Sequence, residues 1–217
     1  MIAVEYPGYG LYKGNSSEQQ IQADAEAVFD YLTTKMNMHP RNIIVFGRSI
    51  GSGPATWLAS RKNIGALVLM SAFTSIRAVV HHLAGKWAQY LIKERFNNLE
   101  HISRVTCPTF IVHGLKDRLI PFKHAQQLYS KNISQEFRTN TFQLDKCRGL
   151  CELVLPKDMD HIEFDFSEDF TVPLIEFLGK ISFGLAPTKN IRITFGSELF
   201  QPPQTEITVN SFRSPRY

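Results

Sequence analysis

The sequence predicts an α/β fold in which helices cover both faces of a mostly parallel sheet. Apolar runs of strand length alternate with stretches of helical periodicity, and this alternation is typical of parallel strands joined by crossover helices. Two of the runs, 43–46 and 66–70, are continuously apolar, as strands buried on both faces are. A content of 43% hydrophobic and 20% charged residues over 217 positions fits one globular domain and excludes disordered, collagen-like and disulfide-scaffold proteins.

The predicted elements follow one another in alternation. The expected strands are 2–6, 42–46, 66–70, 109–112 and 152–155, with a turn at 7–10 after the first. The expected helices are 17–36, 49–61, 123–130 and 169–181, together with an amphipathic stretch over 76–96. The first helix is predicted from Ile21, Ala25 and Val28, which recur at helical spacing, and it ends before His39 and Pro40.

Two polar segments stand apart from this pattern. Residues 135–149 are expected to form a surface loop, which an α/β scaffold tolerates easily. Residues 1–183 are predicted to form the main domain, and residues 184–217 a polar, weakly basic extension.

Net charge, cysteine content and targeting signals indicate which cellular compartments and classes of partner are expected. The net charge of +4 is too small a surplus to call for nucleic acid as a partner. No apolar run approaches the roughly 20 residues that span a bilayer, and no signal-peptide pattern opens the chain. Cys147 and Cys151 have the C-x3-C spacing of a metal site, but no second Cys/His pair stands at zinc-finger spacing. Together with Cys107 they are better explained as buried or unreactive free thiols. Free thiols are typical of a reducing compartment, which favours a cytoplasmic protein.

The motif that carries chemistry is G-x-S-x-G at 47–51, between a predicted strand and a predicted helix. In that context Ser49 stands on a tight turn with its hydroxyl above the sheet. Side chains at Gly47 and Gly51 are expected to collide with neighbouring backbone. The N–H of Ile50 is then placed at the helix N-terminus, where it can donate to an oxyanion. The alternative is a serine in a glycine-rich turn that is shaped only for packing.

A serine hydroxyl needs a base to become a nucleophile, and the base needs an orienting acid. In this strand–turn–helix context the chain order is serine, acid, histidine. Asp117 follows the strand at 109–112, and His161 follows the last predicted strand. Both therefore lie at the carboxyl ends of strands, where such sheets place their ligand crevice. Only His124 and His161 follow the acid, and His124 belongs to a predicted helix.

Four segments carry a resemblance to a known family. They are Glu5-Tyr6-Pro7-Gly8-Tyr9-Gly10, Phe46 to Ala55, His113 to Pro121 and Met159 to Phe164. Together they resemble the α/β-hydrolase superfamily, and more narrowly the eukaryotic alpha/beta-hydrolase-domain-containing proteins of the group 17 and group 13 types. The resemblance implies a Ser-Asp-His triad of Ser49, Asp117 and His161, in a hydrolase that needs no metal or organic cofactor. For the group 17 type it also implies hydrolysis of palmitoyl thioesters on membrane-associated proteins.

The substrate stays open at this point. An acylated protein or a small acyl ester is expected, while serine aminopeptidases and small-molecule esterases share the same core. An inactive fragment or a binding module is the alternative from another class. One departure from the family concerns Ile162, which stands where related sequences often have Asn after the histidine. We expect this change to loosen the local hydrogen bonding. The segment 135–149 also makes the stretch between acid and base longer than usual.

A lid is expected over 73–104, between two of the predicted strands. Its stretch 81–92 is aromatic and apolar, with Lys86, Lys93 and Arg95 within it or nearby. One interpretation is a cap that receives an acyl chain and touches the cytoplasmic face of a membrane as a peripheral protein. The other is a helix whose apolar face covers the sheet.

The chain opens on apolar residues, without a polar lead-in. In the resembled fold three strands precede the one expected at 2–6, and the loop after the third of them supplies the second oxyanion donor. We therefore expect an N-terminally incomplete hydrolase, with an unpaired sheet edge and half of its oxyanion hole.

Overall fold

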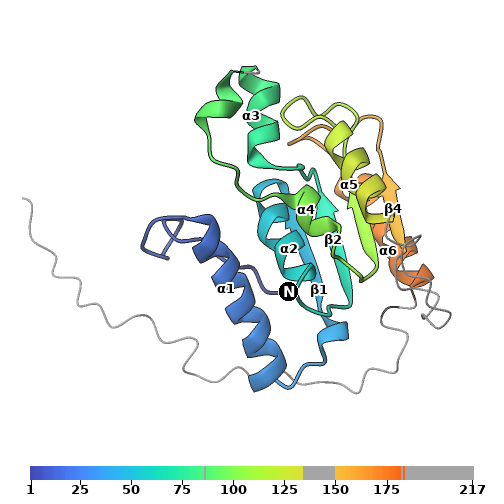
Figure 1. Ribbon diagram of the computed structural model, residues 1–217. Coiled ribbons are helices and arrows are strands. Elements are labelled where there is room, and N and C mark those ends of the chain that lie inside the picture. Colours follow the sequence, from blue (N-terminus) through green and yellow to red (C-terminus); the bar gives the residue numbers. More distant parts are fainter. Residues whose placement is uncertain (86, 134–149, 182, 184–217) are drawn as a thin grey trace, which may run out of the picture. The chain divides into compact units, whose positions relative to one another are not determined.

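Four parallel strands form the centre of the structure, a computed structural model that describes residues 1–85, 87–133, 150–181 and 183 (Figure 1). The strands are β1 (Ile44–Arg48), β2 (Ala66–Met70), β3 (Thr109–Val112) and β4 (Cys151–Val154). They pair in the order β1-β2-β3-β4, and each pair is parallel. The last rung of the ladder joins the final residues of all four strands, Arg48, Met70, Val112 and Val154. The predicted α/β fold with a mostly parallel sheet is confirmed.

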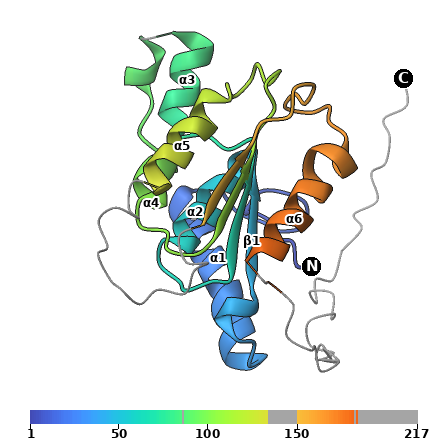
Figure 2. The ribbon, with the colours of Figure 1, turned by 90° about the vertical axis from the view of Figure 1, so that its right-hand side faces the viewer.

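Six α-helices and several short turns of helix surround the sheet in the described part of the chain. The α-helices are α1 (Glu18–Asp30), α2 (Ser52–Ala59), α3 (Ile76–Ala84), α4 (Asn98–Ile102), α5 (Lys123–Ile133) and α6 (Val172–Lys180). The 3-10 turns are Pro40–Asn42, Ser49–Gly51 and Ala88–Leu91, and the π-helical turns are Tyr31–Lys35 and Phe166–Thr171. Figure 2 shows α6 on one side of the sheet and α2, α4 and α5 on the other.

Each face of the sheet packs against its own helices, because successive side chains of a strand point to opposite faces. Leu67, Leu69 and Ile111 are buried in the layer that contains α1, α2, α4 and α5. On the other face Phe110 lies against Phe177 of α6, with ring centroids 5.4 Å apart. Both faces of β2 and β3 are therefore covered, which explains why these strands are continuously apolar.

Polar side chains cap the first turns of several helices and thereby fix where these helices begin. Ser17 accepts a hydrogen bond from the N–H of Gln20 at 3.1 Å, and this bond fixes the first turn of α1. Ser75 accepts from the N–H of Ala78 at 3.2 Å and does the same for α3. α4 was not predicted, because its five residues give too short a periodic pattern; Asn97 caps it.

The predicted bounds of β2 and β3 are confirmed, but β1 continues through Gly47 instead of ending there. A Cβ at Gly47 would lie 2.5 Å from the carbonyl oxygen of Gly51 and 2.6 Å from the Cβ of Ala55. Gly47 is therefore a point of close approach between β1 and the start of α2, and it does not break the strand.

The predicted strand at 2–6 is wrong, although the turn after it is present. The side chain of Glu5 accepts hydrogen bonds from the N–H groups of Leu11 at 3.2 Å and Tyr12 at 3.0 Å, which folds the chain back on itself. An apolar run becomes a strand only beside a partner, and within the described residues β1 pairs with β2 alone.

Some predictions fall on residues that the structure does not describe. The loop expected at 135–149, the extension at 184–217 and Cys147 lie outside the described residues, and they stay predictions. Among the described helices, none has both the length and the apolar character needed to cross a membrane.

The contact of α6 with the sheet predicts a large loss of stability on truncation. Phe177→Ala is expected to lower the free energy of unfolding by about 3–5 kcal/mol, because removal of a fully buried ring leaves a cavity in the core. Urea unfolding followed by circular dichroism measures the change. Ile175→Ala, on the same helix but 62% exposed, is the matched control and is expected to stay within about 0.5 kcal/mol of the parent. Equal effects of the two substitutions would contradict this account of the core.

Candidate active site

Ser49 lies on the turn between β1 and α2. Its φ of +49° is in the left-handed region that residues other than glycine rarely adopt, at a cost on the order of 1–3 kcal/mol. The hydroxyl of Ser52 donates to the carbonyl oxygen of Ser49 at 2.6 Å and ties this turn to the helix that follows. The strained backbone is thus held by its neighbours, as a nucleophile elbow requires.

The structure accounts differently for the two glycines of the motif. Gly47 has the predicted one, since a side chain there would collide with the backbone of the elbow. For Gly51 the prediction is wrong, because a Cβ would meet only the hydroxyl of Tyr6, at an ordinary distance of 3.5 Å. Its φ of −65° also places no demand on glycine. Gly51 contributes the carbonyl oxygen that excludes a side chain at Gly47.

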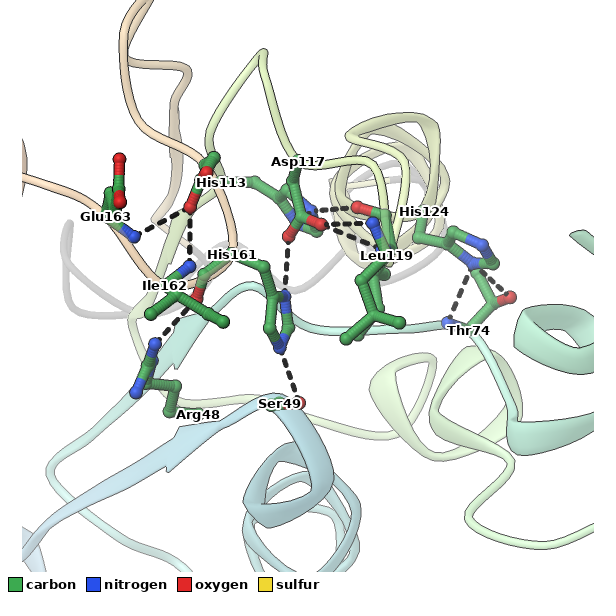
Figure 3. Close-up of polar contacts among 12 residues, drawn as sticks. Arg48, Ser49, Thr74, His113, Asp117, Leu119, His124, His161, Ile162 and Glu163 are labelled. Atoms are coloured by element: carbon green, nitrogen blue, oxygen red, sulfur yellow. Dashed lines mark hydrogen bonds and ion pairs between the residues drawn. The ribbon is translucent and has the colours of Figure 1, made fainter. Parts of the chain in front are cut away.

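The structure brings the three predicted triad residues together in one chain of hydrogen bonds (Figure 3). Nε2 of His161 lies 3.1 Å from Oγ of Ser49, and Nδ1 of His161 lies 2.8 Å from Oδ2 of Asp117. The three side chains come from the segments that follow β1, β3 and β4. A base is therefore within hydrogen-bond reach of the serine and is oriented by a carboxylate.

Asp117 is charged and firmly held. Its side chain is fully buried, which raises the pKa of the carboxyl, but hydrogen bonds from His113, from the N–H of Ile120 and from His161 outweigh burial and bring the pKa below its ordinary value. Oδ1 accepts from the N–H groups of Leu119 at 3.0 Å and Ile120 at 2.8 Å. The second oxygen is left to the imidazole of His161.

His113 is a site residue that the sequence reasoning missed. The ring is completely buried, with Nε2 2.7 Å from the carbonyl oxygen of Ile120 and 3.3 Å from Oδ2 of Asp117. Because a carbonyl oxygen can only accept, Nε2 carries the proton, which also points at the carboxylate. The i, i+4 spacing of His113 and Asp117 was the signal in the sequence that could have indicated this contact.

Arg48, the variable residue before the nucleophile, is the second residue that was missed. Its guanidinium donates to the carbonyl oxygen of His161 at 2.6 Å and lies 5.3 Å from the centroid of the Phe164 ring (Figure 3). The elbow is thereby bonded directly to the loop that carries the histidine.

The loosening expected from Ile162 is also wrong. Oδ1 of Asp160 accepts from the N–H of Ile162 at 2.6 Å and from that of Glu163 at 2.7 Å. These main-chain bonds do not depend on the side chain at position 162, so the turn after His161 is held without an asparagine.

Ile50 follows Ser49 in the first turn of helix, where main-chain N–H groups have no partner in the preceding turn. Its N–H therefore lies at the start of the helical segment after Ser49, as expected, and its role as an oxyanion donor stays a prediction. The second oxyanion donor also stays a prediction.

His124, the other histidine that follows the acid, has a different partner. Its Nδ1 accepts from the N–H of Thr74 at 3.2 Å and lies 2.9 Å from the hydroxyl oxygen of the same residue (Figure 3). Burial, with the nearby His113 and His82 adding to it, lowers the pKa of His124 to about 4. This imidazole is neutral at physiological pH and supports α5 against the chain after β2.

Comparison with known proteins agrees with this geometry. The sequence profile of the prolyl oligopeptidase family matches residues 8–143. Alpha/beta hydrolase domain-containing protein 17B of Homo sapiens is 34% identical over 131 residues, which cover 60% of this chain and 44% of that protein. Alpha/beta hydrolase domain-containing protein aho-3 of Caenorhabditis elegans is also 34% identical, over 60% of this chain and 39% of its own length. The chain thus spans less than half the length of these relatives, and the resemblance to the group 17 type is confirmed.

A solved structure shows the same fold. The esterase Pf2001 of Pyrococcus furiosus superposes with a TM-score of 0.61 and 19% sequence identity, over 81% of this chain and 68% of that one. At this level of identity the likeness extends to the fold, and the α/β-hydrolase architecture is confirmed.

The bond from Arg48 predicts that the elbow positions the histidine. Arg48→Met is expected to slow the reaction of Ser49 with a fluorophosphonate about 10-fold, because a charge-assisted hydrogen bond to the loop of His161 is lost. Arg48→Lys retains a cationic donor and should recover part of the rate. The measurement is the second-order rate of labelling, with thermal unfolding checked in parallel.

The matched control for this experiment is Arg104→Met. Arg104 makes a comparable short contact, 2.6 Å to Glu100, on the exposed surface of the molecule. It should label at the parental rate. A parental rate for Arg48→Met would show that the bond does not position the base.

The lowered pKa of His124 predicts a pH-dependent stability. The unfolded chain takes up a proton near pH 6.5, whereas the folded protein resists until about pH 4, so the stability from neutral His124 is complete above pH 6.5 and is lost as the pH falls toward 4. In His124→Gln the difference in urea midpoint between pH 7 and pH 5 should shrink. His39→Gln, at an exposed position, should leave that difference unchanged, and an unchanged difference in His124→Gln would refute the assignment.

Proposed function

Since the chain belongs to the prolyl oligopeptidase family of α/β-hydrolases, we propose that it is a serine hydrolase that cleaves an acyl ester or thioester through Ser49, His161 and Asp117. The observation that carries this proposal is the hydrogen-bonded order of the three side chains, 3.1 Å from Oγ to Nε2 and 2.8 Å from Nδ1 to Oδ2. An acid, a base and a strained serine in this order have the geometry of an acyl-transfer site.

The proposed reaction has two steps. Nε2 of His161 takes the proton of Ser49 as Oγ attacks the acyl carbonyl carbon, and the N–H of Ile50 donates to the oxyanion that forms. The proton then passes from His161 to the leaving thiol or alcohol as its bond to the acyl carbon breaks. Water hydrolyses the acyl-serine by the same route, which releases the acid and restores the hydroxyl. Asp117 holds the imidazole tautomer and stabilises its charged form throughout.

The finer proposal is a long-chain acyl thioester, such as a palmitoylated protein at the cytoplasmic face of a membrane. One observation supports it. The resemblance to the group 17 type implies this substrate, and 131 residues of the chain are 34% identical to a human protein of that group. A thiolate also leaves more readily than an alkoxide or an amine, an order that holds for any serine triad and does not by itself select the thioester.

The match to the prolyl oligopeptidase family favours a second candidate, a peptidase or aminopeptidase on the same triad. An amine is a poor leaving group, so cleavage of an amide depends more strongly on proton transfer from His161 than cleavage of an ester or thioester does. The two candidates share the nucleophile and differ in the acyl bond.

Active-site labelling with a fluorophosphonate tests the nucleophile. The parent chain is expected to label and Ser49→Ala to give no label, whereas Ser167→Ala, at an exposed serine outside the elbow, should keep Ser49 reactive. Equal labelling of the parent and Ser49→Ala, or no labelling of the folded parent, would refute the assignment.

The acyl preference is then read from parallel assays of a palmitoyl thioester, a short-chain ester and an aminoacyl amide. A higher kcat/KM on the thioester supports the finer proposal. A preference for the amide would replace it with the peptidase, and Asp117→Asn should lower each rate that survives by about 10⁴-fold.

A further inference from the structure

Four large apolar or aromatic side chains are exposed on the segment that runs from the end of α3 through the turn Ala88–Leu91. They are Leu83, Trp87, Tyr90 and Leu91, which are 54%, 87%, 78% and 88% exposed, and we call them the cap patch. Single exposed apolar residues are common on protein surfaces, but four large ones within nine positions are not. Such a patch indicates an interaction surface.

The inner side of the same segment is already used. Ile76 and Val79 of α3 pack against a buried cluster that includes Phe73, so this helix does cover the body of the protein. After α3 the chain turns at Gly85, whose φ is +84°, and a side chain there would meet nothing within 4 Å. The cap patch follows this turn on the outside. The inner side of the segment therefore agrees with the interpretation of a covering helix, and the membrane interpretation concerns only its outer side.

The chemistry of the patch fits a membrane surface better than another protein core. Trp87 and Tyr90 combine an apolar ring with a polar group, and such side chains favour the interface between lipid and water. Lys93 and Arg95 are exposed directly after the patch. The one acid between them, Glu94, lies 3.9 Å from Arg77 and is balanced by it. The flank of the patch is therefore net positive, as a site for anionic lipids must be.

We propose that the cap patch docks on the surface of a phospholipid bilayer that contains anionic lipids. Figures 1 and 2 show α3 beyond the carboxyl ends of the strands, the end at which the segments of the candidate triad also begin. Docking brings that end of the sheet to the membrane, where an acylated protein would present its thioester. This last step rests on the proposed function, whereas the docking itself does not.

The test is co-sedimentation of the full chain with vesicles of phosphatidylcholine alone and of phosphatidylcholine with phosphatidylserine. The parent is expected to bind the anionic vesicles, more weakly as salt rises. The double variant Trp87→Ala with Leu91→Ala should bind about 10-fold more weakly to both kinds, because two large apolar contacts are lost. Lys93→Gln with Arg95→Gln should lose the preference for phosphatidylserine, by about 5-fold or more.

The controls separate this proposal from the others. Ile175→Ala with Val172→Ala removes two exposed apolar side chains from α6 and should bind as the parent does. Ser49→Ala should also bind fully, so a failed nucleophile assignment leaves this result intact. Parental binding by Trp87→Ala with Leu91→Ala would overturn the proposal. Absence of vesicle binding together with self-association that this variant abolishes would assign the patch to a second copy of the chain instead.

Discussion

The buried carboxylate of Asp117 is the constraint around which the candidate site is built. Four donors converge on it: the N–H groups of Leu119 and Ile120 on Oδ1, and the rings of His161 and His113 on Oδ2. Without them a buried anion would be costly, by several kcal/mol. The charge therefore stabilises the structure only if the segments after β3 and β4 meet around it. The same requirement fixes the tautomer of His161, because Nδ1 must donate and Nε2 is left to face the nucleophile.

The register of the sheet makes this meeting possible. All four strands end on one rung, so the segments that leave β1, β3 and β4 start at the same level. Two close approaches then set their distances. A Cβ at Gly114 would lie 2.1 Å from the carbonyl oxygen of Met159, so only glycine lets the acid loop lie against the histidine loop. Gly47 plays the same part between the strand and the elbow. Backbone packing at these two glycines thus sets how closely the three segments approach one another.

The sequence predicted those parts of the fold that depend on local pattern. Ala66–Met70 and Thr109–Val112 were found with their bounds because each is buried on both faces and reads as one apolar run. The strand predicted at 2–6 is absent, because pairing depends on a neighbouring strand that a local pattern does not reveal. The site divides in the same way. The motif at 47–51, the positions after predicted strands and the order serine, acid, histidine together were enough to select Ser49, Asp117 and His161. His113 and Arg48 act through contacts across the fold, which spacing alone does not encode.

The contact of Arg48 with the main chain of His161 shows where a fixed motif leaves room for a protein to adjust its own site. The G-x-S-x-G pattern places no chemical demand on its second position, so the residue there is free to serve another part of the fold. In this chain it reaches the histidine loop, while Asp160 closes the turn from the other side. The nucleophile and its base are then coupled through the side chain of Arg48 and the main chain of His161, as well as by the bond between Oγ and Nε2. These contacts fix the positions of the two groups in advance, and such preorganised geometry is a main source of rate enhancement in the acyl transfer that we propose.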